Sequence, residues 1–464
     1  MKTQFHIKLN ILVIFLFLFF SSSLLLSAKV LAISIEEERK LGQSFLAQIR
    51  KHFELIEDDF ANQFITDLGH YLIRPLETKP FPFHFYIIKS NHQNAFAAPG
   101  GHIFVFSGLV EGMESLDELA AVICHEIGHV SARHLSQRIE QSKKIGLATM
   151  AGILAGALIG GELAQAVAAG SMAAGVQAQL NYSRQDERQA DQLGFEYMKS
   201  SGINPSGMIT TLKKLEKGRL WGTDRIPPYL LTHPTGPERM SNLDAMLSHF
   251  KPESPKREVL RFRSDFQLFR TILRAKSLES KDAERLFQRD LEDDPSSPLP
   301  HLGLGIVYKE RSEYDLAIHH LRTALKAAPS SAVILRELGE TYQLKGQNRE
   351  AISILEEALE LDAENRSTLF LLAISYENLE SYGRAVELFE KLSYFRPVNK
   401  DVYYHLGISY GRLNKLSLAH YNFGLYFKRL RETEKAKFHF QKADQLSAND
   451  PVLRRKIHEA SKGL

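Results

Sequence analysis

The chain has 464 residues, of which 44% are hydrophobic and 24% are charged. This composition predicts a folded globular protein with room for more than one domain. The formal net charge of +3 is too small to produce a strong field of one sign, so neither nucleic acid nor an anionic membrane is predicted as the main partner. The single cysteine, Cys124, cannot form an internal disulfide, so hydrophobic cores must hold the domains together.

Residues 1–32 have the pattern of a secretory signal peptide. Lys2 and Lys8 precede an apolar run that begins at Ile11, and small residues suited to cleavage follow at Val30-Leu31-Ala32. We therefore expect export, with residues 1–32 removed. The alternative is an uncleaved membrane anchor, because the run is nearly long enough to span a bilayer.

Residues 125–129 read His-Glu-Ile-Gly-His, and the S-x-x-E helix-start signal at 115–118 places this pentapeptide within a helix. On a helix, His125 and His129 lie one turn apart on the same face, where both ring nitrogens can reach one metal ion. Glu126 lies to the side of this pair, where its carboxylate can take a proton from water at the metal. The pattern predicts one zinc ion and peptidase chemistry.

Two neighbours of these residues have structural interpretations. Gly128 costs a helix up to about 1 kcal/mol relative to alanine, so we expect it to permit close packing beside the metal; the alternative is a tolerated glycine. Cys124 points about 100° away from His125 on a helix, which favours burial as a small apolar side chain over zinc ligation.

A catalytic zinc usually has three protein ligands, so a third side chain must come from elsewhere in the chain. Glu187 is the candidate, in a polar stretch of helical character, with Asp191 at i+4 on the same face. This spacing suits a ligand carboxylate followed by a second carboxylate that orients a ligand imidazole. Without the pentapeptide, both would be interpreted as solvated helix charges.

These motifs resemble the zinc endopeptidases related to the CAAX prenyl proteases, as does the stretch from Asn94 to Leu109. The resemblance covers residues 35 to about 240 and implies an α+β zincin-like fold of the gluzincin type. It also implies the following roles: zinc ligation by His125, His129 and Glu187, general base and then acid for Glu126, and support of the ligands by Asp191.

The Thr232-His233-Pro234 sequence, followed by Arg239, matches a loop of the soluble periplasmic branch of that family. The resemblance implies that His233 can approach the zinc as a fourth ligand and hold the enzyme latent. The alternative is a loop histidine that orders the turn beside Pro234. The candidates for an oxyanion stabiliser are His233, Arg184 and Tyr182, among which spacing does not choose.

Two apolar stretches before the metal helix predict strands, at 83–88 and at 102–106, with Gly100-Gly101 as a turn. If 102–106 forms an exposed edge, it can bind an extended peptide as an added strand. The alternative is an ordinary paired core strand.

Residues 145–183 are rich in alanine and glycine and carry a single formal charge. They are a poor membrane span, so we expect packed helices or a cover over the metal site. A peripheral membrane contact through 145–180 is the alternative.

The last part of the chain repeats with a period of 34 residues, which is typical of tetratricopeptide repeats. The Leu-Gly/Ala-x-x-Tyr signature recurs at Leu304, Leu338, Leu372 and Leu406, and alanines recur at Ala283, Ala317, Ala351, Ala385 and Ala419. We expect five units from about 264 to 433, in which the repeated residues pack paired helices. A new register begins at Gly424, so the helix near 417–430 is predicted to belong to two repeats.

The predicted domains are a signal peptide (1–32), a zinc metallopeptidase domain (33–255) and an all-α tetratricopeptide solenoid (256–464). This organisation resembles periplasmic quality-control proteases of Gram-negative bacteria, which implies misfolded or stalled outer-membrane proteins as substrates and the barrel assembly machinery as partner of the repeats. One alternative is a chaperone or scaffold that acts through its repeats with an idle zinc site. Another is a membrane-anchored protease.

Overall fold

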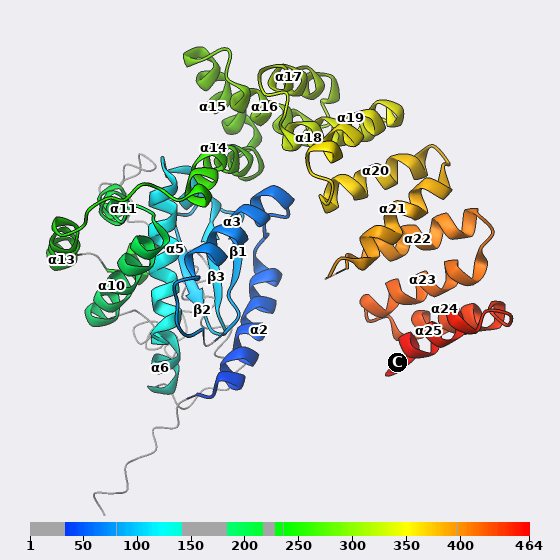
Figure 1. Ribbon diagram of the computed structural model, residues 1–464, viewed down its shortest axis with the longest axis horizontal. Coiled ribbons are helices and arrows are strands. Elements are labelled where there is room, and N and C mark those ends of the chain that lie inside the picture. The colour runs from blue at the N-terminus through cyan, green and yellow to red at the C-terminus, as the bar shows by residue number, and fades with distance from the viewer. Residues whose placement is uncertain (1–32, 80, 142–182, 217–227, 235, 397) are drawn as a thin grey trace, which may run out of the picture. The chain divides into compact units, whose positions relative to one another are not determined.

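The structure is a computed structural model, and it describes residues 33–79, 81–141, 183–216, 228–234, 236–396 and 398–464 (Figure 1). The predicted signal peptide, the alanine-rich stretch 145–180 and Tyr182 lie outside these residues. By its contacts the chain divides into two units, Met1–Ile56 with Ile65–Phe262 and Glu57–Phe64 with Arg263–Leu464. The domain boundaries expected from sequence remain predictions. In the described part of the chain, no helix combines the length and the hydropathy that a membrane span requires.

The first unit is built on a three-stranded sheet of β1 (His84–Ile88), β2 (Ala95–Ala98) and β3 (His102–Phe106), in the order β1-β3-β2. β1 runs parallel to β3, and β2 runs antiparallel to it. Gly100 and Gly101, both with positive φ, make the turn between β2 and β3, as predicted. Of the two interpretations of 102–106, the exposed edge is wrong and the paired core strand is confirmed, because β3 is the central strand and its five residues are buried.

Helices surround this sheet, and aromatic side chains hold the first described helix, α2, against it. Ser34 and Glu37 form a capping box that begins α2, and Phe45 of α2 meets Phe96 and Phe104 of the sheet with ring centroids 5.9 Å apart. The described helices of this part are α2 (Ile35–His52), α3 (Asp59–Leu72), α4 (Ser107–Glu111), α5 (Leu116–Ser131), α6 (His134–Gln141), α10 (Arg184–Ser201), α11 (Ser206–Glu216), α12 (Pro228–Thr232) and α13 (Pro237–Ser248).

The second unit is a series of antiparallel helix pairs (Figure 1). Its helices are α14 (Arg257–Ser277), α15 (Ser280–Asp293), α16 (Pro298–Glu310), α17 (Tyr314–Ala327), α18 (Ala332–Leu344), α19 (Asn348–Leu361), α20 (Arg366–Asn378), α21 (Tyr382–Tyr394), α22 (Lys400–Arg412), α23 (Leu416–Arg429), α24 (Thr433–Leu446) and α25 (Pro451–Ser461). The recurring alanines are all buried, in agreement with their predicted packing role.

Helix α23 belongs to two pairs, as the change of register predicted. A Cβ on Gly407 of α22 would come within 2.7 Å of the Phe423 ring of α23. In the same way, a Cβ on Gly424 of α23 would come within 2.6 Å of the Phe440 ring of α24. Each glycine therefore lets the next helix approach, and α23 is the second helix of one pair and the first of the next.

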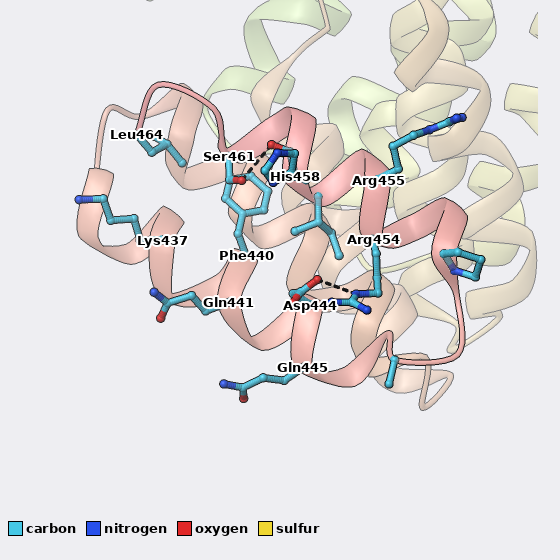
Figure 2. A pocket seen from close by; sticks show the side chains of 13 residues that line it. Lys437, Phe440, Gln441, Asp444, Gln445, Arg454, Arg455, His458, Ser461 and Leu464 are labelled. Atoms are coloured by element: carbon cyan, nitrogen blue, oxygen red, sulfur yellow. Dashed lines mark hydrogen bonds and ion pairs between the residues drawn. The ribbon is translucent and has the colours of Figure 1, made fainter.

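Helices α24 and α25 line an open pocket of about 870 Å³ (Figure 2). Arg454 of α25 donates a hydrogen bond of 3.0 Å to Asp444 of α24 across it. Leu453 and Ile457 of α25 are buried against Phe440, so α25 covers an apolar face of α24.

Candidate active site

The helix that carries the pentapeptide is α5, and its start is capped by Ser115, whose side chain accepts a hydrogen bond from the backbone of Glu118. The second half of the predicted capping signal differs from expectation, because the Glu118 carboxylate accepts from the backbone of Glu114 and pairs with Lys214 at 2.7 Å. The helix runs through the site to Ser131 and is buried over most of its length.

Two glycines allow α10 to lie directly on α5. A Cβ added to Gly128 would stand 2.8 Å from the carbonyl oxygen of Ala190, and one added to Gly194 would stand 3.2 Å from the backbone nitrogen of His125. Gly128 thus has the packing role predicted for it. This close approach brings Glu187 and Asp191, both buried on α10, against the histidines of α5.

His125, His129, Glu187 and His233 each place one possible ligand atom within 4.8 Å of the others. The Nε2 atoms of His125 and His129 are 3.0 Å apart, and each lies 3.4 Å from an oxygen of Glu187. Ligand atoms at about 2.0–2.2 Å from one zinc ion in tetrahedral geometry are about 3.3 Å apart. These atoms therefore stand at separations that suit one zinc ion.

Hydrogen bonds behind the two α5 histidines turn their lone pairs towards this point. His125 Nδ1 lies 2.9 Å from an oxygen of Asp191 and donates to it, so Nε2 offers its lone pair to a metal ion or, without one, to a second proton. His134 Nε2 lies 3.1 Å from Oε1 of Gln189 and donates to it, so His134 Nδ1 accepts from His129 Nδ1 at 3.0 Å. His129 Nε2 is then also a lone pair. Two lone pairs and a carboxylate face one another, and a cation between them relieves the repulsion.

The buried charges of the site favour a divalent cation. Three carboxylates and one guanidinium are buried here, those of Glu126, Glu187, Asp191 and Arg239, which sum to a formal charge of −2. Burial opposes charging of His125, yet the carboxylates of Glu187 and Asp191 raise its pKa to about 9. Burial also opposes ionisation of Glu187, yet the charges of His233 and Arg239 hold its pKa well below the usual value. The surroundings that attract a proton also attract a metal ion.

Glu126 and His233 face each other beside the ligand atoms. Glu126 is fully buried, and neither of its oxygens has a hydrogen-bond partner among the described residues. His233 Nε2 lies 3.5 Å from Glu126, while His233 Nδ1 lies 3.0 Å from Glu187 and 3.3 Å from His125 Nε2. The imidazole of His233 therefore stands between the carboxylate of Glu126 and the ligand atoms.

Helix α12 holds His233 in this position. The His233 ring stacks on Tyr229 with centroids 4.5 Å apart, and the His233 backbone donates to the Tyr229 carbonyl. The Tyr229 backbone in turn donates to the carbonyl of Gln93, just before β2. A cavity of about 160 Å³ reaches Glu187 beside Pro234.

The structure thus brings together all six predicted site residues, namely His125, Glu126, His129, Glu187, Asp191 and His233. Cys124 is buried, and burial raises the pKa of its thiol, which agrees with the predicted apolar role. Of the oxyanion candidates, Arg184 lines the cavity beside Glu187.

Sequence reasoning missed two functional contacts. Arg239 pairs with Asp191 and Glu187, both at 2.6 Å, and His134 supports His129. The sequence indicates Arg239 only as a residue that follows the Thr-His-Pro motif. The signal for His134 is its place five residues after His129, in the turn that follows the metal helix.

Comparisons with known proteins agree with this site and with the repeats. Residues 61–247 match peptidase family M48, and residues 297–364 and 417–450 match tetratricopeptide repeats. The crystal structure of MamA covers 33% of this chain and 89% of its own, with a TM-score of 0.31 and 22% identity. The matches to a peptidase family M48 model and then to tetratricopeptide repeat models, in that order along the chain, confirm the predicted fold class.

Among curated proteins, the chain is a homologue of those named beta-barrel assembly-enhancing protease, which confirms the predicted resemblance. The Escherichia coli protein of that name is 30% identical over 68% of this chain and 65% of its own length. The putative Vibrio cholerae one is 28% identical over 66% and 64%. The match thus spans just under two thirds of these relatives. The Arabidopsis thaliana mitochondrial metalloendopeptidase OMA1 is 36% identical over 32% of this chain and 28% of its own.

Proposed function

We propose that the chain is a zinc-dependent endopeptidase whose metal is held by His125, His129 and Glu187. One observation carries this proposal: two imidazole lone pairs and a carboxylate converge in a buried site of net negative charge. Nitrogen and carboxylate ligands in tetrahedral reach favour zinc over the harder cations magnesium and calcium, which prefer oxygen ligands. Asp191 orients His125, and His134 orients His129.

Glu126 is the proposed general base and acid. Bound zinc lowers the pKa of water and polarises a peptide carbonyl. Glu126 is buried beside the ligand atoms without being one of the three, so its carboxylate is available to take a proton from the attacking water. The same carboxyl group then delivers the proton to the leaving amine, which completes hydrolysis of the peptide bond.

We propose that His233 holds the site latent as a fourth ligand. Support comes from the ring of His233, which lies 3.5 Å from Glu126 and 3.0 Å from Glu187, in the space that an attacking water would need. Withdrawal of α12 would remove this ring from the site. The stacking on Tyr229 means that His233 and α12 move together.

The proposed setting is the periplasm, after export by the signal peptide 1–32. The proposed substrates are misfolded or stalled outer-membrane proteins, and the repeats engage the barrel assembly machinery. Support comes from the secretory pattern of the first residues and from the names of the relatives. Protein ligands also suit the concave surface of stacked helical repeats.

Zinc content and casein cleavage test this function in three forms of the full chain. Wild type is expected to hold one zinc and cleave casein, Glu126→Gln to keep its zinc without cleaving, and Glu187→Ala to bind zinc more weakly. Full cleavage by a zinc-loaded Glu126→Gln protein would overturn the assignment. If that variant is inactive while barrel proteins still assemble in its presence, the repeats act as a scaffold.

A further inference from the structure

Residues 57–64, which we call the resident segment, pack with the repeats. They comprise the end of a loop and the first turns of α3. The ring of Phe64 stacks on Phe269 of α14 with centroids 4.4 Å apart, and Phe60 stacks on Phe64 at 6.4 Å. An aromatic pair at i, i+4 thus faces the first helix of the repeats.

The aspartates of the resident segment reach several repeats at once. Asp58 lies 3.5 Å from Lys276 of α14 and 3.6 Å from Arg336 of α18. Asp59 accepts a hydrogen bond of 3.2 Å from the backbone of Ser367, at the start of α20. Since α18 and α20 are the first helices of two successive pairs and contact each other, the two adjacent aspartates lie along the side that these first helices form, which we call the concave face.

The concave face presents more positive than negative charge to this segment. The charged groups of its cluster are three cations and two carboxylates, namely Lys276, Lys309, Arg336, Glu337 and Glu340. The sum is +1, and the carboxylates of Asp58 and Asp59, which both act on Arg336, bring it to −1. Lys309 is already paired with Glu337 and Glu340, so a carboxylate from a ligand would pair chiefly with Lys276 and with Arg336, which is buried when the segment is in place.

We propose that this face is a recognition site for an acidic helical segment with a phenylalanine pair, and that residues 57–64 occupy it until a partner protein presents a segment of the same chemistry. Asp58 neutralises the cations while its other oxygen caps α3 through the backbone of Ala61. The ligand therefore needs an aspartate at a helix start, where it serves both purposes. This inference does not depend on the metal site.

A peptide that copies residues 57–72 tests the proposal in the full chain. In the wild type the resident segment competes with the peptide. The apparent affinity for the peptide is therefore the intrinsic affinity multiplied by the fraction of molecules in which the site is unoccupied. A variant with Asp58→Ala and Phe64→Ala loosens the resident segment. Fluorescence anisotropy of the labelled peptide is expected to show at least about tenfold tighter binding to this variant.

Matched controls separate recognition from misfolding. Arg336→Ala added to the loosened variant is expected to abolish binding, as is a peptide in which asparagine replaces both aspartates. Hydrogen exchange in the unmodified wild type is a second measurement, in which saturating peptide should speed exchange of the amides of residues 60–64.

Two results would overturn the proposal. One is that the peptide does not bind a loosened variant whose circular dichroism matches wild type, and does not change the hydrogen exchange of the wild type. Residues 57–64 would then be a permanent structural contact of the repeats. The other is an affinity for the peptide that stays the same when Arg336 is replaced by alanine or when asparagine replaces both peptide aspartates.

Discussion

Replacement of Gly128 by alanine tests whether the contact between α5 and α10 builds the metal site. The new Cβ would stand 2.8 Å from the Ala190 carbonyl oxygen, whereas ordinary contact begins near 3.4 Å. The difference, 3.4 − 2.8, requires α10 to retreat by about 0.6 Å. Glu187 lies one turn before Ala190 on the same helix, so it retreats too.

The expected effect on stability is small and the effect on zinc is large. Overpacking costs about 1–3 kcal/mol, and the better helix propensity of alanine returns up to about 1 kcal/mol, so the net loss is about 0–2 kcal/mol. Zinc–oxygen bonds of about 2.0–2.2 Å do not stretch by 0.6 Å. We expect zinc affinity to fall by about 10–100-fold, as for other disturbances of ligand position.

Competition with a chromophoric chelator measures the zinc affinity, and urea unfolding measures the stability. Gly383→Ala is the matched control, because Gly383 lies in α21 with no atom within 4 Å of a new Cβ. That variant should keep wild-type zinc affinity and equal or slightly higher stability. A Gly128→Ala protein with zinc affinity within about threefold of wild type would show that the glycine does not set the ligand position.

Three further results are expected. Asp191→Asn should weaken zinc binding by about 10–100-fold, because the hydrogen bond behind a ligand imidazole loses its charge; chelator competition measures this, and an effect no larger than that of the exposed Asp244→Asn would contradict it. His233→Ala should raise casein cleavage several-fold by opening the site to water, and unchanged or lower cleavage by a zinc-loaded variant would remove the latency proposal. Burial opposes ionisation of Glu337, but Lys309 holds the pKa of this carboxyl below its usual value, so the stabilisation is present above about pH 4.5 and is lost as the pH falls below it. Urea unfolding from pH 7 to 3 should therefore show a smaller loss of stability in Glu337→Gln, which starts from a lower value, and parallel curves would refute the pairing.

Local patterns in the sequence were sufficient to predict much of the site. The i, i+4 spacing fixes His125 and His129 on one face of a helix whatever the tertiary structure is. Glu187 and Asp191 follow the same rule on their own helix. That Glu187 and Asp191 meet the two histidines in space is implied by the family resemblance, because no local spacing connects the two helices. The repeats could also be predicted from sequence, because a 34-residue period is recognised by comparing the chain with itself.

The features that sequence reasoning missed depend on contacts between distant segments. The status of 102–106 as a central strand depends on β1 and β2 pairing with it on both sides, which an apolar pattern does not reveal. Arg239 neutralises the carboxylate of Asp191, which lies 48 residues away, and no local spacing in the sequence predicts such a pair. The resident segment is similar, because an Asp-Asp-Phe sequence before a helix is also an ordinary helix start.

The double membership of α23 affects where the chain can be cut. The turn between Arg429 and Thr433 separates two helices and resembles a clean end for a shortened protein. A truncation there would strip Phe440 from Gly424 and leave an apolar flank of α23 open to solvent, inviting aggregation. Shortened forms of the solenoid should therefore end before α22 or keep the chain through α25.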